Sequence, residues 1–279
     1  MSTHRSRGLG QHNVCAYLFA AVSVALWVSA DALELNGPLT QGSLIRGKLP
    51  AGSQIWLDNK PLQLAADGHF VFGFGRDASL IHELTWTTDG DRFRTRTLTL
   101  KKRSYRIQRI DGLPKKYVSP KGLTLARIKR EAKRVAAARA QTDQRTDFMA
   151  TFVWPADGRI SGVYGSQRIL NGKPRRPHFG VDVAAPVGAP VIAPAPGTIT
   201  LAEPDLYFSG GTIVLDHGHG VSSAFLHLHR LHVAVGQDVS QGELIGEVGA
   251  TGRVTGPHLD WRMNWFGERV DPALLVPKR

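Results

Sequence analysis

The stretch Pro177-His178-Phe179-Gly180-Val181-Asp182-Val183 alternates polar or small residues with apolar ones. On a β-strand, His178, Gly180 and Asp182 share one face, whereas the intervening apolar residues face the core. An imidazole and a carboxylate then point the same way, with a gap free of side chains between them. Neutral imidazole and carboxylate are ligands that suit Zn²⁺. The stretch therefore predicts a strand that presents two candidate metal ligands, His178 and Asp182.

Two later segments repeat this kind of pattern. In Phe225-Leu226-His227-Leu228-His229 both histidines are expected on one face, opposite the two leucines. In Gly256-Pro257-His258-Leu259-Asp260-Trp261, His258 and Asp260 are spaced two apart. One such pair alone is more typical of an exposed strand face, but three such segments in one neutral domain favour a metal site.

The sequence around these segments predicts a compact all-β domain. From Phe152 onward the chain is rich in Gly, Pro and Val, and it contains a weak internal repeat, Val187–Val191 against Val235–Val239. A Gly-containing turn and an apolar run follow each copy, so we expect two related β-units. A lipoyl-type carrier domain is excluded, because residues 180–252 lack the lysine that such a domain needs.

Residues 152–272 resemble the catalytic domain of the M23 metallopeptidases, the lysostaphin- and LytM-type peptidoglycan endopeptidases. The resemblance rests on three motifs: His178-Phe-Gly-Val-Asp182 for H-x-G-x-D, Phe225-Leu-His227-Leu for Y-x-H-L, and Gly256-Pro-His258-Leu-Asp260-Trp for G-P-H-L-H-[FW]. It implies a LytM-like fold with a duplicated motif. The region upstream resembles that of Gram-negative periplasmic members.

The resemblance also implies the roles of single residues. Two zinc ligands fall on His178 and Asp182, the two catalytic histidines fall on His227 and His258, and the third ligand, normally histidine, falls on Asp260. An aspartate oxygen lies as far from Cβ as imidazole Nδ1 does, so Asp260 can replace a histidine that coordinates through Nδ1. The His/Asp/Asp set is harder and more anionic. His229 is the less favoured candidate for the vacant ligand position.

The upstream chain divides into two further parts. Residues 31–104 alternate around turns such as Asp67-Gly68 and Asp89-Gly90, which predicts a small N-terminal β-domain of sandwich-like form. Residues 105–150 form a basic linker with a helix expected from about Leu123 to Phe148. With 151–279 as the peptidase-like domain, the predicted fold class is mainly β.

Composition narrows the function classes. The net charge of +12 is concentrated in residues 101–150, which carry +11, whereas residues 151–279 are neutral. Two interpretations of the basic linker are open: a connector helix that packs one thin apolar stripe, or a segment that contacts an anionic wall or membrane surface. Aromatic residues are sparse there, so a nucleic-acid partner is not expected. A single cysteine excludes a disulfide scaffold.

The N-terminus has the form of a secretory signal. Arg5 and Arg7 precede an apolar run over residues 14–28, and Val28-Ser29-Ala30 resembles a cleavage site. We expect residues 1–30 to be a signal peptide cleaved after Ala30 and the protein to be exported to the periplasm, with an uncleaved membrane anchor as the alternative.

Together these observations predict an exported zinc metalloendopeptidase that hydrolyses peptide cross-links of peptidoglycan. The resemblance to Gram-negative members favours the D-Ala–diaminopimelate bond and implies peptidoglycan stem peptides as the partner. The alternative is a catalytically degenerate LytM-type regulator that activates a cell-wall amidase, and only Asp260 favours it.

Overall fold

The computed structural model describes Met1 and residues 33–110, 123–141, 143–170 and 172–279. The predicted signal peptide therefore lies outside the described residues. No helix in the described ranges is both long and apolar enough to cross a membrane.

The N-terminal part consists of two antiparallel sheets. One contains β1 (Glu34–Asn36), β2 (Leu44–Lys48) and β5 (His69–Gly73); the other contains β4 (Lys60–Pro61), β3 (Gln54–Leu57), β6 (Ile81–Thr87) and β7 (Arg94–Thr99). Their alternating apolar residues form a common core, which includes Ile45, Phe70, Phe72, Leu84 and Leu98. The sandwich-like form expected from the period-2 pattern is present.

The C-terminal part is built on one large sheet. Its order is β18 (Asp238–Val239), β14 (Gly197–Leu206), β15 (Gly210–Asp216), β16 (Val221–Leu228), β20 (Leu259–Trp265), β12 (Val181–Ala184) and β9 (Arg159–Gly162), with β21 (Glu268–Val270) paired to β20. A smaller sheet contains β13 (Pro190–Ile192), β19 (Leu244–Glu247) and β17 (Arg230–Leu231). Two short 3₁₀ turns, η2 (Asp147–Met149) and η3 (Pro272–Leu274), complete this part.

The internal repeat corresponds to a reciprocal exchange of strands. In the first copy, the Gly188 N–H donates to the Val248 carbonyl at 2.9 Å, and in the second the Gly236 N–H donates to the Ile199 carbonyl at 2.8 Å. Each copy thus pairs with the strand region that follows the other: β13 with β19, and β18 with β14. Both turn glycines adopt a φ near +90°, which residues with a Cβ avoid. The two related β-units are therefore folded into each other.

The linker contributes a strand and a helix. β8 (Ile107–Ile110) pairs in parallel with β10 (Gln167–Leu170), which forms a hairpin with β11 (Lys173–Pro174). The helix α1 (Leu123–Arg139) packs Val135 and Ala138 against an apolar group on β14, β15 and β16. The thin-stripe interpretation of this helix is therefore the one that the packing supports.

The helix α1 ends at Arg139, whereas the sequence pattern predicts an end near Phe148. The chain leaves the helix because Phe148 is fully buried in the C-terminal core, where its N–H donates to the His217 carbonyl at 2.9 Å. Residues 140–147 include two threonines and two aspartates, which are poor helix formers, so the helix has little support beyond Arg139.

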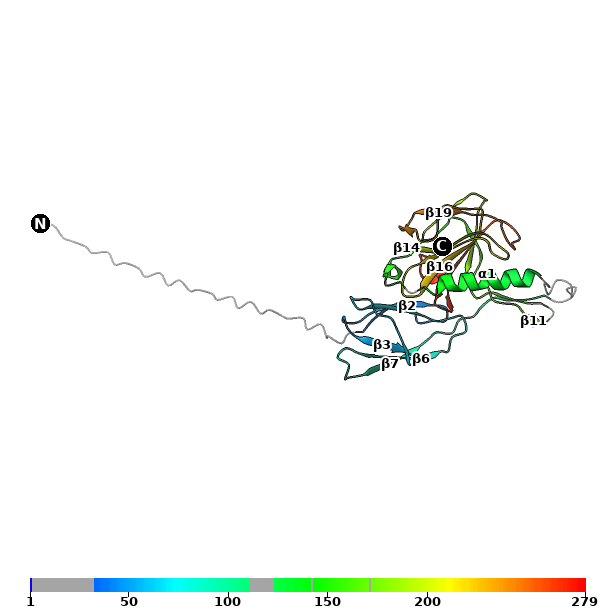
Figure 1. Cartoon of the computed structure of the whole chain (residues 1–279). Helices are drawn as coiled ribbons and strands as arrows, with labels where there is room; N and C mark the ends of the chain where they lie inside the picture. The colour runs from blue at the N-terminus through cyan, green and yellow to red at the C-terminus, as the bar shows by residue number, and fades with distance from the viewer. Residues whose placement is uncertain (2–32, 111–122, 142, 171) are drawn as a thin grey trace.

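The N-terminal sheet rests directly on the C-terminal part. Leu44 and Val71, from β2 and β5, belong to the C-terminal core. Arg46 on β2 donates to the carbonyls of Phe148 at 2.6 Å and Ala150 at 3.0 Å. In Figure 1, the N-terminal strands accordingly lie beneath the C-terminal part, with α1 running across the C-terminal part itself.

Candidate active site

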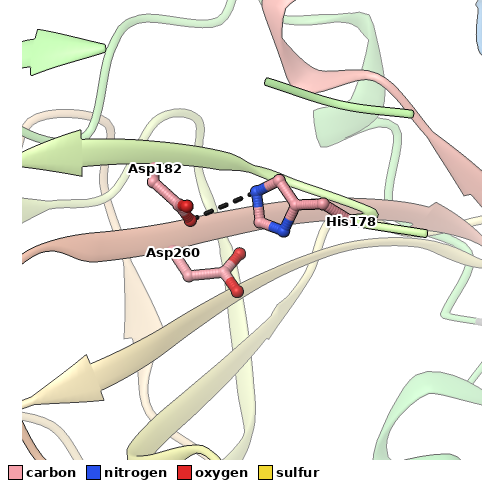
Figure 2. A group of neighbouring side chains, drawn as sticks. All are labelled: His178, Asp182 and Asp260. Atoms are coloured by element: carbon pink, nitrogen blue, oxygen red, sulfur yellow. Dashed lines mark ion pairs between the residues drawn. The ribbon is translucent and has the colours of Figure 1, made fainter. Parts of the chain in front are cut away.

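Three side chains that could ligate a metal converge where β12 and β20 pair. Asp182 on β12 is directly opposite Asp260 on β20, so both carboxylates project from the same face of the sheet. His178 precedes β12, and its N–H donates to the Ser166 carbonyl at 2.8 Å. One ligand atom from each side chain lies within 4.8 Å of the others. Figure 2 shows the three side chains directed toward a common point.

Two glycines leave room for these carboxylates. A Cβ on Gly180 would lie 2.5 Å from Asp260 Oδ1 and 2.6 Å from the Trp261 carbonyl oxygen. A Cβ on Gly162 would lie 2.1 Å from Asp182 Oδ2. The gap predicted between His178 and Asp182 is thus occupied by Asp260, the third member of the group.

The donor atoms of this group fit a bound metal ion. His178 Nε2 and Asp182 Oδ1 are 3.2 Å apart, close enough for an ion pair, yet neither buried atom makes a hydrogen bond within the described part of the chain. Burial opposes protonation of His178, but the neighbouring Asp182 and Asp260 carboxylates raise its pKa above the ordinary value. A buried nitrogen and oxygen without hydrogen-bond partners, both aimed at one point, form the donor arrangement that a cation satisfies.

The third carboxylate already has a partner. Arg262 donates from Nε to both Asp260 oxygens at 3.0 Å, and from its terminal Nη2 to Oδ2 at 2.5 Å. Burial alone would raise the pKa of Asp260, but the guanidinium of Arg262 lowers it below its usual value. A carboxylate has about four lone-pair positions, so this contact leaves room for a metal on Asp260. Nothing in the spacing of the motif indicated Arg262.

Two histidines stand next to the metal group. The rings of His227 and His258 have centroids 5.0 Å apart, and His258 Nε2 lies 3.9 Å from Asp182 Oδ1. His227 Nδ1 is 2.9 Å from the Thr251 carbonyl oxygen, and His258 Nδ1 is 2.8 Å from that of Gly256. A carbonyl only accepts, so each Nδ1 carries the proton and each Nε2 is left as the basic nitrogen when the ring is neutral. Burial lowers the pKa of His227, which favours this neutral form.

The alternation predicted for His227 and His229 does not hold. The register of β16 against β15 shifts between Phe225 and Leu228, and His227 itself adopts a left-handed φ of +68°. This bulge turns His227 into the interior, whereas His229 is exposed and lies outside the metal group. A single extra residue in the strand separates two histidines that a regular strand would place together.

Two further histidines are structural. His217 is fully buried, with Nδ1 2.7 Å from the Pro196 carbonyl oxygen and Nε2 2.8 Å from Ser223 Oγ. Burial lowers the pKa of His217 to about 4. His219 packs against the ring of Phe148. Neither belongs to the metal group.

The metal group and the histidine pair line one groove of about 1780 Å³. The helix α1 also lines this groove, with residues from Ile128 to Arg139. The sequence placed the helix in a linker and did not indicate that it borders the site. The groove is larger than a small-molecule pocket, and its volume is sufficient for a peptide.

Comparisons with known proteins find relatives of the region that contains these residues. The model of peptidase family M23 matches residues 176–272. The cell division protein DipM of Caulobacter vibrioides is 33% identical over 149 residues, 51% of this chain and 24% of that protein. The peptidoglycan DD-endopeptidase ShyA of Vibrio cholerae is 38% identical over 136 residues, 45% of this chain and 31% of that protein. The matched region thus spans about a quarter to a third of the length of these curated relatives.

A solved structure extends the likeness beyond the family motif. A crystal structure of a Pseudomonas aeruginosa protein described as a peptidase M23 has a TM-score of 0.65 and 29% identity, and the match covers 86% of this chain and 96% of that one. So long a match reaches outside residues 176–272 and includes strands of the N-terminal part. The motifs and the family match together identify residues 176–272 as similar to peptidase family M23, and the likeness in fold extends over most of this chain.

Proposed function

We propose that this protein is an exported zinc metalloendopeptidase that hydrolyses peptide cross-links of peptidoglycan, with the D-Ala–diaminopimelate bond as the favoured target. The observation that carries the proposal is the histidine pair: His227 and His258 both direct a basic Nε2 into the groove beside three converging metal ligands. A chain that had lost catalysis would have no need to hold both imidazoles in this tautomer.

Each residue has a defined task in this proposal. His178, Asp182 and Asp260 would hold Zn²⁺, which when bound supplies Lewis-acid polarisation of the scissile carbonyl and of an attacking water. His258 Nε2, on the Asp182 side of the pair, accepts a proton and returns it to the leaving amine. The buried His227 ring stabilises the oxygen on which negative charge develops only after Nε2 has taken up a proton, because in the neutral ring this nitrogen is an acceptor.

The names of the relatives support the substrate class. ShyA of Vibrio cholerae is named a peptidoglycan DD-endopeptidase, and Mpg of Neisseria meningitidis, which is 42% identical over 118 residues, is named a DD-carboxypeptidase/endopeptidase. A bond between D-amino acids in a peptidoglycan cross-link is the corresponding substrate for this chain. Such a substrate lies outside the cytoplasm, which supports export and the signal peptide predicted for residues 1–30.

The exposed face of α1 supports a contact with an anionic wall or membrane surface. Arg127 and Arg134 pair with Asp205 and Glu203 of the C-terminal part, so their charges are partly neutralised. Lys129, Arg130 and Lys133 remain exposed. Because exposed charges are screened by salt, sacculus binding should weaken at raised ionic strength while cleavage of small muropeptides does not.

The peptidase proposal is tested with purified full-length protein, zinc and cross-linked muropeptides, alongside His178→Ala and Asp260→Ala. We expect monomers from the wild type and none from His178→Ala. If the wild type releases no monomers at any zinc loading, the peptidase proposal is wrong. If Asp260→Ala keeps full activity and zinc, the enzyme assignment survives but the third ligand is misassigned.

A second function, regulation of a cell-wall amidase, is favoured by one contact. Arg262 donates three hydrogen bonds to the oxygens of Asp260 and so takes up most of the lone-pair positions that a metal could use there. A regulator needs only the shape of the groove and no metal. Adding wild-type protein or His178→Ala to an amidase distinguishes the two functions: equal stimulation by both, with no cross-link cleavage, supports regulation.

A further inference from the structure

The groove beside the metal group is strongly basic. Eight arginines line it, against only three acidic side chains: Glu131, Asp182 and Asp260. Glu131 is paired with Arg127, Asp260 is paired with Arg262, and Asp182 belongs to the metal group. Residues 151–279 are neutral in composition, yet their fold and α1 place the arginines on one concave surface.

Seven of these arginines have no acidic partner among the described residues, and three of the seven influence one another's charge: Arg139 on α1, Arg176 just before His178, and Arg269 on β21. Arg139 Nε is buried and makes no hydrogen bond within the described ranges. The Arg269 guanidinium donates to Asn264 Oδ1, a neutral acceptor. The Arg176 guanidinium lies 5.5 Å from the centre of the Phe179 ring.

The three guanidinium groups repel one another as well as Arg262. Burial lowers the pKa of Arg139 to about 9, and the charges of Arg269, Arg262 and Arg176 add to that effect. Burial likewise lowers the pKa of Arg269 to about 10, with Arg262 and Arg176 contributing. Like charges held together without a counter-ion destabilise the folded chain, so an anion in the groove would be bound favourably.

Arginine is also chemically selective for such a ligand. Its planar fork of N–H donors matches the two oxygens of a carboxylate, and it loses less hydration than lysine does when it is buried. Among the described residues, arginines line the groove and lysines do not. This composition is typical of a site that orients a carboxylate rather than one that only attracts a polyanion.

We propose that Arg139, Arg176 and Arg269 form a carboxylate-binding subsite that fixes an acidic peptide in the groove next to the metal group. The identity of the ligand as a peptide rests on the proposed function, because the metal ligands and the histidine pair that share the groove act on amide bonds. The subsite selects peptides with a free carboxylate near the bond to be cleaved, and it discriminates against the amidated form.

The test measures binding separately from hydrolysis. The full-length chain with His258→Gln, loaded with zinc, is titrated in a calorimeter with a D-Ala–diaminopimelate peptide and with the same peptide amidated at its carboxyl groups. We expect the free-carboxylate peptide to bind at least about tenfold more tightly, as charge-assisted hydrogen bonds require. Arg139→Gln and Arg176→Gln should each remove most of that preference. The control is Arg130→Gln: Arg130 lies on α1 like Arg139, but it is exposed and outside the groove, so this variant should retain the preference.

Three results would overturn the subsite: no preference in the parent protein, a preference unchanged in both groove variants, or tighter binding of inorganic polyphosphate that depends on the same arginines. Arg176 is exposed, so its variant remains informative even if Arg139→Gln folds poorly. The proposed function can fail independently of the subsite. If the wild-type protein cleaves no cross-link but still binds the free-carboxylate peptide more tightly, the subsite is supported and the peptidase proposal is wrong.

Discussion

Arg262 and Asp260, two residues apart on β20, form a partly buried pair in which one guanidinium binds both oxygens of the buried carboxylate. With Asp182, Asp260 and Arg262 counted together and His178 neutral, the ligand group has a formal charge of −1. A His/Asp/His group has the same charge. The arginine thus offsets the extra carboxylate that Asp260 introduces, and it holds that carboxylate in the position opposite Asp182.

Replacing Arg262 should destabilise the metal-free protein more than the zinc-loaded one. Arg262→Met leaves the 3%-exposed Asp260 without a charge partner, so we expect a loss of about 3 kcal/mol in the free energy of unfolding. Zinc would take over the role of counter-charge and reduce that loss. Urea unfolding with zinc and with chelator measures both values.

The control for this experiment is Arg230→Met. The Arg230 side chain is 69% exposed and approaches Glu247 only at 4.0 Å, so its loss should change stability by less than about 0.5 kcal/mol. Equal losses for Arg262→Met with and without zinc would show that Asp260 does not contact the metal.

Gly180 should tolerate no side chain. In Gly180→Ala the new Cβ meets Asp260 Oδ1 and the Trp261 backbone, and backbone cannot move as a side-chain tip does. We expect a loss of roughly 1–3 kcal/mol in stability together with weaker zinc binding. Thermal unfolding and zinc titration measure the two effects. Gly267→Ala, which meets nothing within 4 Å, is the matched control; a similar loss there would contradict the steric explanation.

The two groove histidines should affect activity and not metal content. In His227→Gln and His258→Gln, the proposed proton transfer and charge stabilisation are lost, so kcat should fall by about 10²–10⁴-fold. Zinc content measured by elemental analysis should stay at the wild-type value. His229→Gln, on the exposed side of the β16 bulge, should leave both unchanged. Loss of zinc in His227→Gln or His258→Gln would make that residue a ligand.

Taken by itself, His217 should lower the free energy of unfolding as the pH falls. Its pKa is about 4 in the folded protein because it is buried, against a usual value of about 6.5. The unfolded chain therefore binds the proton first, so the stabilising contribution of His217 is complete above pH 6.5 and is lost as the pH falls through 4. The destabilisation caused by His217→Asn should thus shrink by about 3 kcal/mol between pH 7 and pH 4.

The neighbouring Asp216 acts in the opposite direction, which is why the test compares variants. Burial raises the pKa of Asp216 to about 6, so protonation between pH 6 and its usual pKa favours the folded state. In the wild type the two effects largely cancel. A difference between wild type and His217→Asn that stays constant with pH would show that His217 does not titrate in the folded protein.

Local spacing was sufficient to predict the polar face of β12. The alternation of His178, Gly180 and Asp182 follows from the two-residue period of a strand, and the structure places all three at the metal group. The internal repeat likewise predicted two related β-units, since each copy contains its own turn glycine and apolar run. These features depend on residues close in sequence, which is why the sequence contained them.

The rest depended on residues that only the fold brings together. A bulge in β16, fixed by pairing with β15, separates His227 from His229, and burial of Phe148 ends α1 early. The pairing of β12 with β20 sets Asp260, and with it Arg262, against Asp182. Charge shows the difference most clearly: composition assigned the positive excess to the linker and left residues 151–279 neutral. Tertiary packing then gathered Arg139 of the linker with Arg176 and Arg269 in one groove, because charge density depends on distance in space and not on position along the chain.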